Sequence, residues 1–321
     1  MKNQYSIIRS VEVALILIVF TIKLPLESAD ILYVTTTDNT IICYDTTGYD
    51  GNAIANTKSV FANTNLFNPQ AIGFDTVGNF YASNSNNTIS KFNQSGIFQS
   101  SISANLNGPL GLAFDFSNNL YVANYNGNNI SKYDSFGNYL ANVNSNGPSA
   151  LSFDSTGKLY VANSVGSTLS IFNTSGVFQL VNTLGGFHLD NPLGIAFDSK
   201  GNIYVSNFGH GPPSIAKNTV SKFNSAGIYL GNLSSGLINP LGIAIDSMDN
   251  IYVVNKGNTI SKFDSSGGYL TSWTTGSSYS DHITFKPFVV PECSTVIMSI
   301  ITLGLIAYLV QRGKWYIKGA C

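Results

Sequence analysis

The chain has 321 residues, of which only 10% are Asp, Glu, Lys or Arg, against about a quarter in an ordinary soluble protein. With 16 basic and 17 acidic residues the net charge is −1, which excludes a general nucleic-acid binder, because such a protein needs a basic face to displace counterions from phosphate. A content of 44% hydrophobic residues also excludes disorder caused by the lack of a core.

The N-terminus has the pattern of a secretory signal peptide. A basic start is followed by an apolar run over residues 13–22, which is short for a membrane span of about 20 residues. Cleavage near Ser28 or Ala29 would leave a mature chain that begins near Asp30. We therefore predict a signal peptide over residues 1–29 and an exported protein, with a retained N-terminal anchor as the alternative.

Residues 30–287 contain one unit that is repeated. The segment Asn191–Asp198 recurs as Asn239–Asp246, and looser copies cover residues 68–75, 108–115 and 147–154. Each copy is followed by a Tyr-rich segment, a third segment rich in Ser and Lys, and a weaker fourth one, with turn residues between them. The period is about 40 to 48 residues. Four short strands in such a period are typical of a propeller blade.

The number of blades follows from the repeats. Five full copies run from residue 68 to about residue 275. Before them, residues 31–34 and 40–45 match the second and third strands of a further blade that lacks its innermost strand. Residues 282–285 match an innermost strand, so we expect this C-terminal strand to complete the N-terminal blade and close the ring. The predicted fold is an all-β, six-bladed β-propeller with four-stranded blades.

These repeats resemble NHL repeats, which form six-bladed propellers. The matching pattern is Asn-Pro-x-Gly-Ile-Ala-Phe-Asp, then Gly-Asn-Ile-Tyr-Val, then an Ile-Ser-Lys-Phe strand. The resemblance implies an interaction platform. In the usual family pattern an Asp follows the Tyr-Val strand, whereas this chain has Asn there. A polar ring built from these positions would therefore carry less negative charge.

Polar residues recur at fixed places in the full blades. The Asp that ends each first strand is expected to form a turn, because a catalytic acid should occur once and not in every blade. The Asn residues after the second strands are either Asx-turn residues or a polar ring at the channel mouth, where Asn207 and Asn255 are candidate ligand contacts. The Lys of the repeated Ser-Lys pairs is expected to face solvent or to block edge pairing.

Other candidate ligand-binding residues lie where the chain departs from the repeat. The fifth blade has an insertion over residues 208–218, and the link before it, residues 185–190, is also long. Extra loop length on a rigid scaffold is where binding residues tend to lie. In propellers both loop types open on the same face, so we expect His188, Asp190 and His210 to gather beside the channel mouth. The alternative is two solvated loop histidines.

A short motif precedes the last apolar segment of the chain. Val290, Pro291 and Glu292 are followed by Cys293 and Ser294. The motif resembles the Val-Pro-Glu-Pro motif of the PEP-CTERM sorting signal of bacteria, from which Cys293 departs because the family has a second proline there. The resemblance implies that a membrane protease of the exosortase type processes the protein at this motif.

The rest of the C-terminus has the order of parts that the same signal requires. A mostly apolar stretch at about residues 296–310 precedes Arg312, Lys314 and Lys318, as in a short transmembrane helix with a cytoplasmic basic tail. We predict a sorting segment over residues 288–321 with transient anchoring in the inner membrane. The expected destination is the cell surface, the outer envelope or the extracellular matrix of a bacterium.

Two functions fit these features. The first is a non-enzymatic, exported propeller without a cofactor that binds a protein or a polysaccharide. The alternative is a metal-dependent enzyme, as implied by the related streptogramin-lyase and gluconolactonase-like propellers, which carry a divalent metal in the channel. Beside the loop residues, His282 is a further candidate for that role. No catalytic residues are assigned, because the sequence shows no Ser-His-acid set and no Gly-x-Ser-x-Gly elbow.

Overall fold

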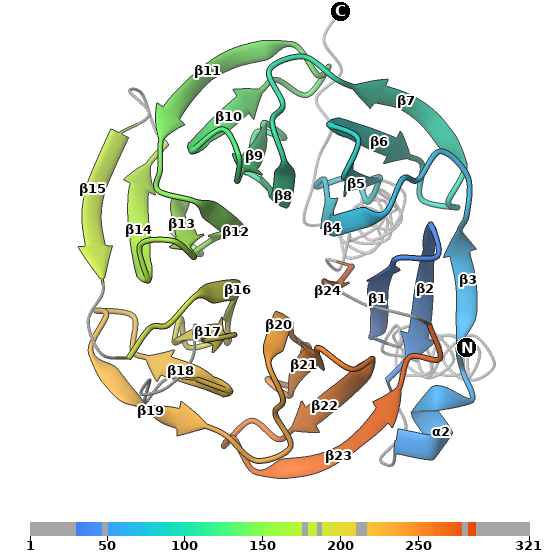
Figure 1. The fold of residues 1–321 in the computed structure, drawn as a ribbon, viewed down its shortest axis with the longest axis vertical. Coiled ribbons are helices and arrows are strands. Elements are labelled where there is room, and N and C mark those ends of the chain that lie inside the picture. Colours follow the sequence, from blue (N-terminus) through green and yellow to red (C-terminus); the bar gives the residue numbers. More distant parts are fainter. Residues whose placement is uncertain are drawn as a thin grey trace, which may run out of the picture.

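The computed structural model describes residues 30–46, 51–174, 179–184, 188–209, 217–277 and 282–286. Six four-stranded antiparallel sheets stand around a central axis and form a six-bladed β-propeller (Figure 1). The predicted fold class, the number of blades and the number of strands in each blade are confirmed. The predicted signal peptide over residues 1–29 and the sorting segment over residues 288–321 lie outside the described residues.

Each blade runs from an innermost strand at the axis to an outermost strand at the rim (Figure 1). The innermost strands of blades 1 to 6 are β24 (Ile283–Phe285), β4 (Pro69–Phe74), β8 (Pro109–Phe114), β12 (Pro148–Phe153), β16 (Pro192–Phe197) and β20 (Pro240–Ile245). The second strands are β1 (Ile31–Thr36), β5 (Phe80–Asn84), β9 (Leu120–Asn124), β13 (Lys158–Asn163), β17 (Ile203–Asn207) and β21 (Ile251–Asn255). The third strands are β2 (Thr40–Asp45), β6 (Thr88–Phe92), β10 (Asn129–Tyr133), β14 (Thr168–Asn173), β18 (Thr219–Phe223) and β22 (Thr259–Phe263). The outermost strands are β3 (Ser59–Ala62), β7 (Phe98–Ile102), β11 (Tyr139–Asn144), β15 (Gln179–Leu184), β19 (Tyr229–Leu233) and β23 (Tyr269–Thr274).

The C-terminal strand closes the ring as predicted. β24 pairs antiparallel with β1, with Leu32 opposite Phe285 and Val34 opposite Ile283. The backbone N–H of Thr35 donates to the carbonyl oxygen of His282 at 3.0 Å. The two ends of the described chain are therefore joined in blade 1, which prevents an open edge at this point of the ring.

A short helix, α2 (Gly51–Ala55), was not expected from the repeats. It lies between β2 and β3 and packs against β23 of blade 6, where the backbone N–H of Gly51 donates to Thr271 Oγ1 at 3.1 Å. Ile54 is fully buried and shares a hydrophobic cluster with Trp273. The helix therefore adds a second contact between the first and last blades. Within the described ranges no helix is long and apolar enough to cross a bilayer.

The second strands form the buried centre of each blade. All residues of β5, β9, β17 and β21 are buried, because each blade packs against a neighbour on both faces. The outermost strands are half exposed, as in β7 and β11. Polar groups at the ends of the second strands are thus enclosed, and buried polar groups need hydrogen-bond partners inside the protein.

The Asn-Pro and Gly-Pro pairs of the repeat mark the start of each innermost strand from blade 2 to blade 6. The residue before the proline has a positive φ in all five blades: Asn68, Gly108, Gly147, Asn191 and Asn239, at 44° to 63°. Gly and Asn adopt this conformation at the lowest cost. The register with the second strand shifts directly after each proline.

Close packing of the inner strands requires glycine at Gly111. A Cβ atom added there would lie 2.7 Å from Ala150 Cα and 2.9 Å from the backbone N of Leu151 in the next blade. We expect Gly111→Ala to lower the free energy of unfolding by about 2 kcal/mol, because the two inner strands must separate. Chemical denaturation measures the change.

Gly166→Ala is the matched control. Its added Cβ would meet the flexible side chain of Asn146 at 3.2 Å, and Gly166 has no positive φ. An equal loss of stability in the Gly111 and Gly166 variants would contradict the packing explanation.

Candidate functional site

The five Asn residues at the ends of the second strands lie inside the blades. Their exposed fractions are between 0% and 2%. Each side-chain amide nitrogen donates to a Ser hydroxyl on the third strand at 2.8 to 3.0 Å. The residues are Asn84, Asn124, Asn163, Asn207 and Asn255. The amide oxygens face the other way and accept a hydrogen bond from the connection that leads to the innermost strand. Each Asn thus joins the third strand to that connection.

Asn207 and Asn255 follow this common pattern. The Oδ1 of Asn207 accepts from the backbone N–H of Asp190 at 3.1 Å, and that of Asn255 accepts from the backbone N–H of Ile238 at 3.1 Å. The geometry gives both side chains a structural role, in line with the turn interpretation that the sequence left open. Ligand contact by these two residues stays a prediction.

The described ends of the two long loops of blade 5 lie side by side. The backbone N–H of Gly209 donates to the carbonyl oxygen of Asp190 at 3.0 Å, so residues 188–190 lie beside residues 207–209. Asp190 is buried, with 9% of its surface exposed. His210 itself and the motif residues Val290, Pro291, Glu292, Cys293 and Ser294 lie outside the described residues.

His188 points to the outer part of its blade. Its ring stacks on Tyr229 of β19, the outermost strand, with ring centroids 3.5 Å apart and an interplanar angle of 7°. The carbonyl oxygen of His188 accepts from Ser221 Oγ at 2.5 Å. His188 therefore packs on the third and outermost strands of blade 5, and its proximity to His210 stays a prediction.

The Asp at the end of each first strand forms a turn, as expected. In Asp198, Oδ1 accepts from the backbone N–H groups of Lys200 and Asn202 at 3.0 and 2.8 Å, and Oδ2 accepts from Asn202 Nδ2 at 2.7 Å. These bonds lower the pKa of the Asp198 carboxyl although partial burial opposes them. Tyr204 on the second strand donates its hydroxyl to the same Oδ2 at 3.2 Å.

The Lys of the third strand lies against an aromatic ring and is half-buried in three blades and buried at Lys262, whereas the sequence predicted that it faces solvent or blocks edge pairing. Its ammonium nitrogen lies 4.9 to 5.2 Å from the ring centroid of the Tyr beside it on the second strand. The pairs are Lys91–Tyr81, Lys132–Tyr121, Lys222–Tyr204 and Lys262–Tyr252. Antiparallel pairing places the two side chains on one face, where a cation is attracted to the ring. The four blades therefore share an Asp–Tyr–Lys arrangement.

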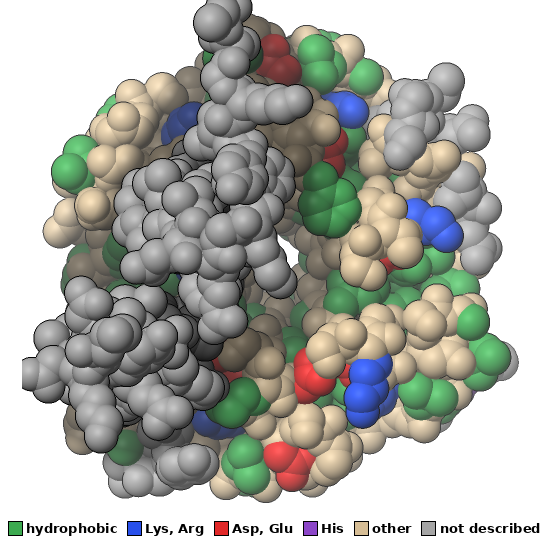
Figure 2. Space-filling model, turned by 180° about the vertical axis from the view of Figure 1, so that it is seen from behind, with side chains coloured by type: hydrophobic (Ala, Val, Ile, Leu, Met, Phe, Trp, Pro, Cys, Tyr) green, Lys and Arg blue, Asp and Glu red, His purple; other side chains and the backbone are tan. Residues whose placement is uncertain are grey.

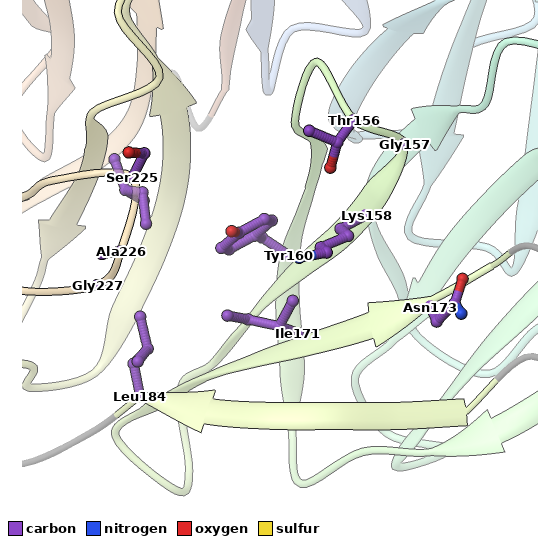
Figure 3. A pocket seen from close by; sticks show the side chains of 11 residues that line it. Thr156, Gly157, Lys158, Tyr160, Ile171, Asn173, Leu184, Ser225, Ala226 and Gly227 are labelled. Carbon is purple, nitrogen blue, oxygen red and sulfur yellow. The ribbon is translucent and has the colours of Figure 1, made fainter.

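Blade 4 departs from this arrangement. Ile171 stands where the four blades have Lys, so no lysine of the third strand covers the ring of Tyr160. A groove of about 680 Å³ lies here between blades 4 and 5 (Figure 3). Sequence reasoning missed this groove, although the replacement of Ser-Lys by Ser-Ile in the repeat was a visible signal.

His282 is the described histidine nearest the axis. It precedes β24, and its Nδ1 accepts from the backbone N–H of Ile72 in blade 2 at 3.4 Å. Burial lowers the pKa of His282 from 6.5 to about 4, although part of its surface stays accessible. The neutral imidazole thus joins the inner strands of blades 1 and 2. Across the described residues, no three His, Cys, Asp or Glu side chains are arranged to hold a metal ion.

Charged side chains are sparse on the side opposite to that of Figure 1. On the visible part of this face, a few acidic and basic groups lie among hydrophobic and neutral ones (Figure 2). This distribution agrees with the low content of charged residues in the sequence.

Comparison of the folded chain with solved structures defines its class. A chain of a nidogen/laminin complex matches with a TM-score of 0.65 and 16% identity over 80% of this chain and 98% of that one. A streptogramin B lyase matches with a TM-score of 0.59 and 14% identity over 82% of this chain and 90% of that one. This protein is a six-bladed β-propeller, and at such low identity the likeness concerns the fold alone.

Two further solved structures with the same fold are a virginiamycin B lyase and a protein of unknown function. The enzyme of Staphylococcus aureus matches with a TM-score of 0.56 and 14% identity over 77% of this chain and 82% of that one. A functionally unknown protein of Desulfotomaculum acetoxidans matches with a TM-score of 0.59 and 16% identity over 80% and 85% of the two chains. No family profile and no curated protein sequence matches the chain.

The buried Asn residues predict a loss of stability on truncation. We expect Asn255→Ala to lower the free energy of unfolding by about 2 kcal/mol, because Ile238 N–H and Ser261 Oγ each lose a buried partner. Asn163→Ala in blade 4 removes the same kind of bond and is the matched variant. A stable Asn255 variant that has lost ligand binding would contradict the structural role.

His282 predicts a pH-dependent stability. The unfolded chain binds a proton near pH 6.5 and the folded chain near pH 4, so the unfolded state binds more protons between these values. The free energy of unfolding should therefore fall by about 3 kcal/mol as the pH drops through this window. Urea denaturation of wild type and His282→Gln measures it, and an identical pH dependence of the two proteins would contradict the assignment.

Proposed function

We propose that this chain is an exported propeller of the NHL type that binds a protein or a polysaccharide without catalysing a reaction. Its predicted destination is the cell surface, the outer envelope or the extracellular matrix, reached through the C-terminal sorting segment and an exosortase-like protease. The membrane contact is transient and uses the apolar stretch near residues 296–310.

One observation supports the binding role above the others. The polar residues that recur in the blades are used in hydrogen bonds and ring contacts inside the blades, as in Asn207, Asp198 and Lys222. The features that set single blades apart are the longer loops of blade 5 and the groove beside blade 4. A binding module usually consists of a regular scaffold on which a few loops or grooves differ from the repeat and contact the ligand.

A metal-dependent enzyme is the second candidate. Its support is the likeness of the fold to streptogramin B lyases and the position of His282 near the axis. The described residues do not by themselves fit a metal, because His282 Nδ1 accepts from a backbone N–H and no group of three ligands is present among them. A site of this kind would require His210 or other residues outside the described ranges.

The proposed sorting predicts a processed chain. We expect the intact mass of the protein from its native host to show loss of residues 1–29 and a new C-terminus between Pro291 and Ser294, in the outer or extracellular fraction. Mass spectrometry of separated membrane and extracellular fractions measures this. A complete C-terminus in the membrane fraction would contradict sorting and leave a membrane-anchored propeller.

The two candidate functions differ in their response to metal ions. For a binding module without a metal, the melting temperature should not change when calcium, magnesium, manganese or zinc is added, because only a ligand of the folded state raises it. A rise of several degrees with one of these ions, lost in His282→Gln, would favour the enzyme.

A further inference from the structure

The groove between blades 4 and 5 has a closed counterpart elsewhere in the same molecule. The equivalent place between blades 2 and 3 is lined by Tyr81, Lys91 and residues 135–137, and its cavity measures about 20 Å³. The groove beside blade 4 measures about 680 Å³, within the range of ligand-binding clefts. The repeat itself therefore does not require this opening.

The groove has an aliphatic floor and a polar rim. Ile171, Leu184 and Ile203 are its aliphatic lining residues. Ser225 to Gly227 of blade 5 face Tyr160 and Ile171 across the gap, and Leu184 lies next to Gly227 (Figure 3). Lys158 is the charged side chain among the lining residues, and it is exposed. Tyr160, Ile171 and Ile203 have only 5%, 7% and 1% of their surfaces exposed, so the half-buried Leu184 offers most of the accessible apolar surface.

Two replacements distinguish blade 4 from the four blades with the Asp–Tyr–Lys arrangement. Ile171 replaces the Lys that lies on the Tyr ring, which makes the floor apolar. Lys158 stands four residues after Asp154, where the other four blades have an Asn whose amide bonds the Asp carboxylate. Blade 4 therefore has its lysine at the rim of the groove, whereas the other four blades have theirs on the Tyr ring.

Blade 1 shows that loss of the Lys does not open a groove by itself. Cys43 stands opposite Tyr33 at the equivalent position, and there the ring of Phe61 packs on Tyr33 with centroids 4.8 Å apart. In blade 4 the two replacements together leave an apolar floor next to an exposed ammonium group.

We infer that this groove binds an acidic peptide segment of a partner protein. An apolar side chain of the peptide lies on Ile171 and Leu184, and a neighbouring carboxylate pairs with Lys158. A peptide suits the surface better than a sugar, because Leu184 in the groove is aliphatic and Ile228, the residue after Gly227, is 62% exposed. The inference rests on the proposed binding role and names its partner class.

The groove lies on the opposite side of the ring from the paired loops of blade 5. It opens between the turn that follows β12 and the turn that follows β18, whereas the loops at Asp190 and Gly209 lie at the other ends of these strands. The peptide site is therefore separate from Asp190 and Gly209, whereas His188 stacks on Tyr229, two residues after the lining residue Gly227.

Fluorescence anisotropy with labelled peptides tests the inference on the folded, exported chain. Three probes separate the contributions of charge and apolar contact: a peptide alternating leucine and glutamate, one alternating serine and glutamate, and one alternating leucine and lysine. We expect the leucine–glutamate peptide to bind and the other two to bind at least about tenfold more weakly.

Variants taken from the other blades provide the matched test. Lys158→Asn removes the rim charge, and the combination Lys158→Asn with Ile171→Lys restores the arrangement of the other four blades at unchanged net charge. Each should weaken binding of the leucine–glutamate peptide about tenfold or more, since an ion pair or the apolar floor is lost. Lys200→Asn removes an exposed charge from the equivalent turn of blade 5 and should leave binding unchanged.

Three results with the peptides would overturn the inference: the absence of binding at millimolar peptide, equal binding by the combined variant, and equal binding of the serine–glutamate peptide. An oligouronate is the probe for a polysaccharide ligand. A fourth contradicting result is binding of the oligouronate but not of the leucine–glutamate peptide, which leaves the proposed role as a binding module standing. Failure of both probe classes together with a metal response would contradict the proposed function itself.

Discussion

The buried amide of an Asn at the end of each second strand is the constraint on which the propeller depends. In the five full blades it joins a Ser of the third strand to the connection that enters the innermost strand. Because the second strand is enclosed on both faces, an unpaired amide there would carry the full cost of desolvation. The same bond therefore fixes both the turn and the path of the chain toward the axis, which positions the loops of blade 5 beside each other.

The rest of each blade follows from strand pairing. Antiparallel pairing sets Tyr204 opposite Lys222, and the turn Asp198 lies within reach of the Tyr hydroxyl. The ring, the cation and the carboxylate stabilise one another in a partly buried place, so the pKa of Tyr204 is raised by burial and by Asp198. In blade 4, where Ile171 replaces the Lys of this arrangement, a groove lies between blades 4 and 5.

Much of the fold could be predicted from the sequence, because each blade repeats the same strand and turn residues. The strand order, the six blades and the closing role of residues 283–285 needed only alignment of the repeats. The orientation of Lys222 could not be predicted in this way, since alternation along a strand does not tell which neighbour a long side chain meets. Helix α2 was also missed, because residues 51–55 have no counterpart in the other blades.

The site was harder to predict than the fold. Loop length predicts that His188, Asp190 and His210 gather, which stays a prediction because His210 lies outside the described residues. The ring of His188 stacks on Tyr229, a contact that depends on the packing of two distant segments. The groove at Ile171 carried a sequence signal in the repeat itself. Departures from a repeat are thus informative at single positions in strands as well as in loops.

Hydrogen–deuterium exchange resolved to single amides tests the role of the Asn residues most directly. The account predicts that the N–H groups of Phe67, Asn107, Asp190 and Ile238, although they lie in connections, are protected as strongly as strand amides. In blade 4 Asn163 accepts from Ser145 Oγ instead, so the N–H of Asn146 should exchange faster than its four counterparts. Rapid exchange at all five positions would contradict the account.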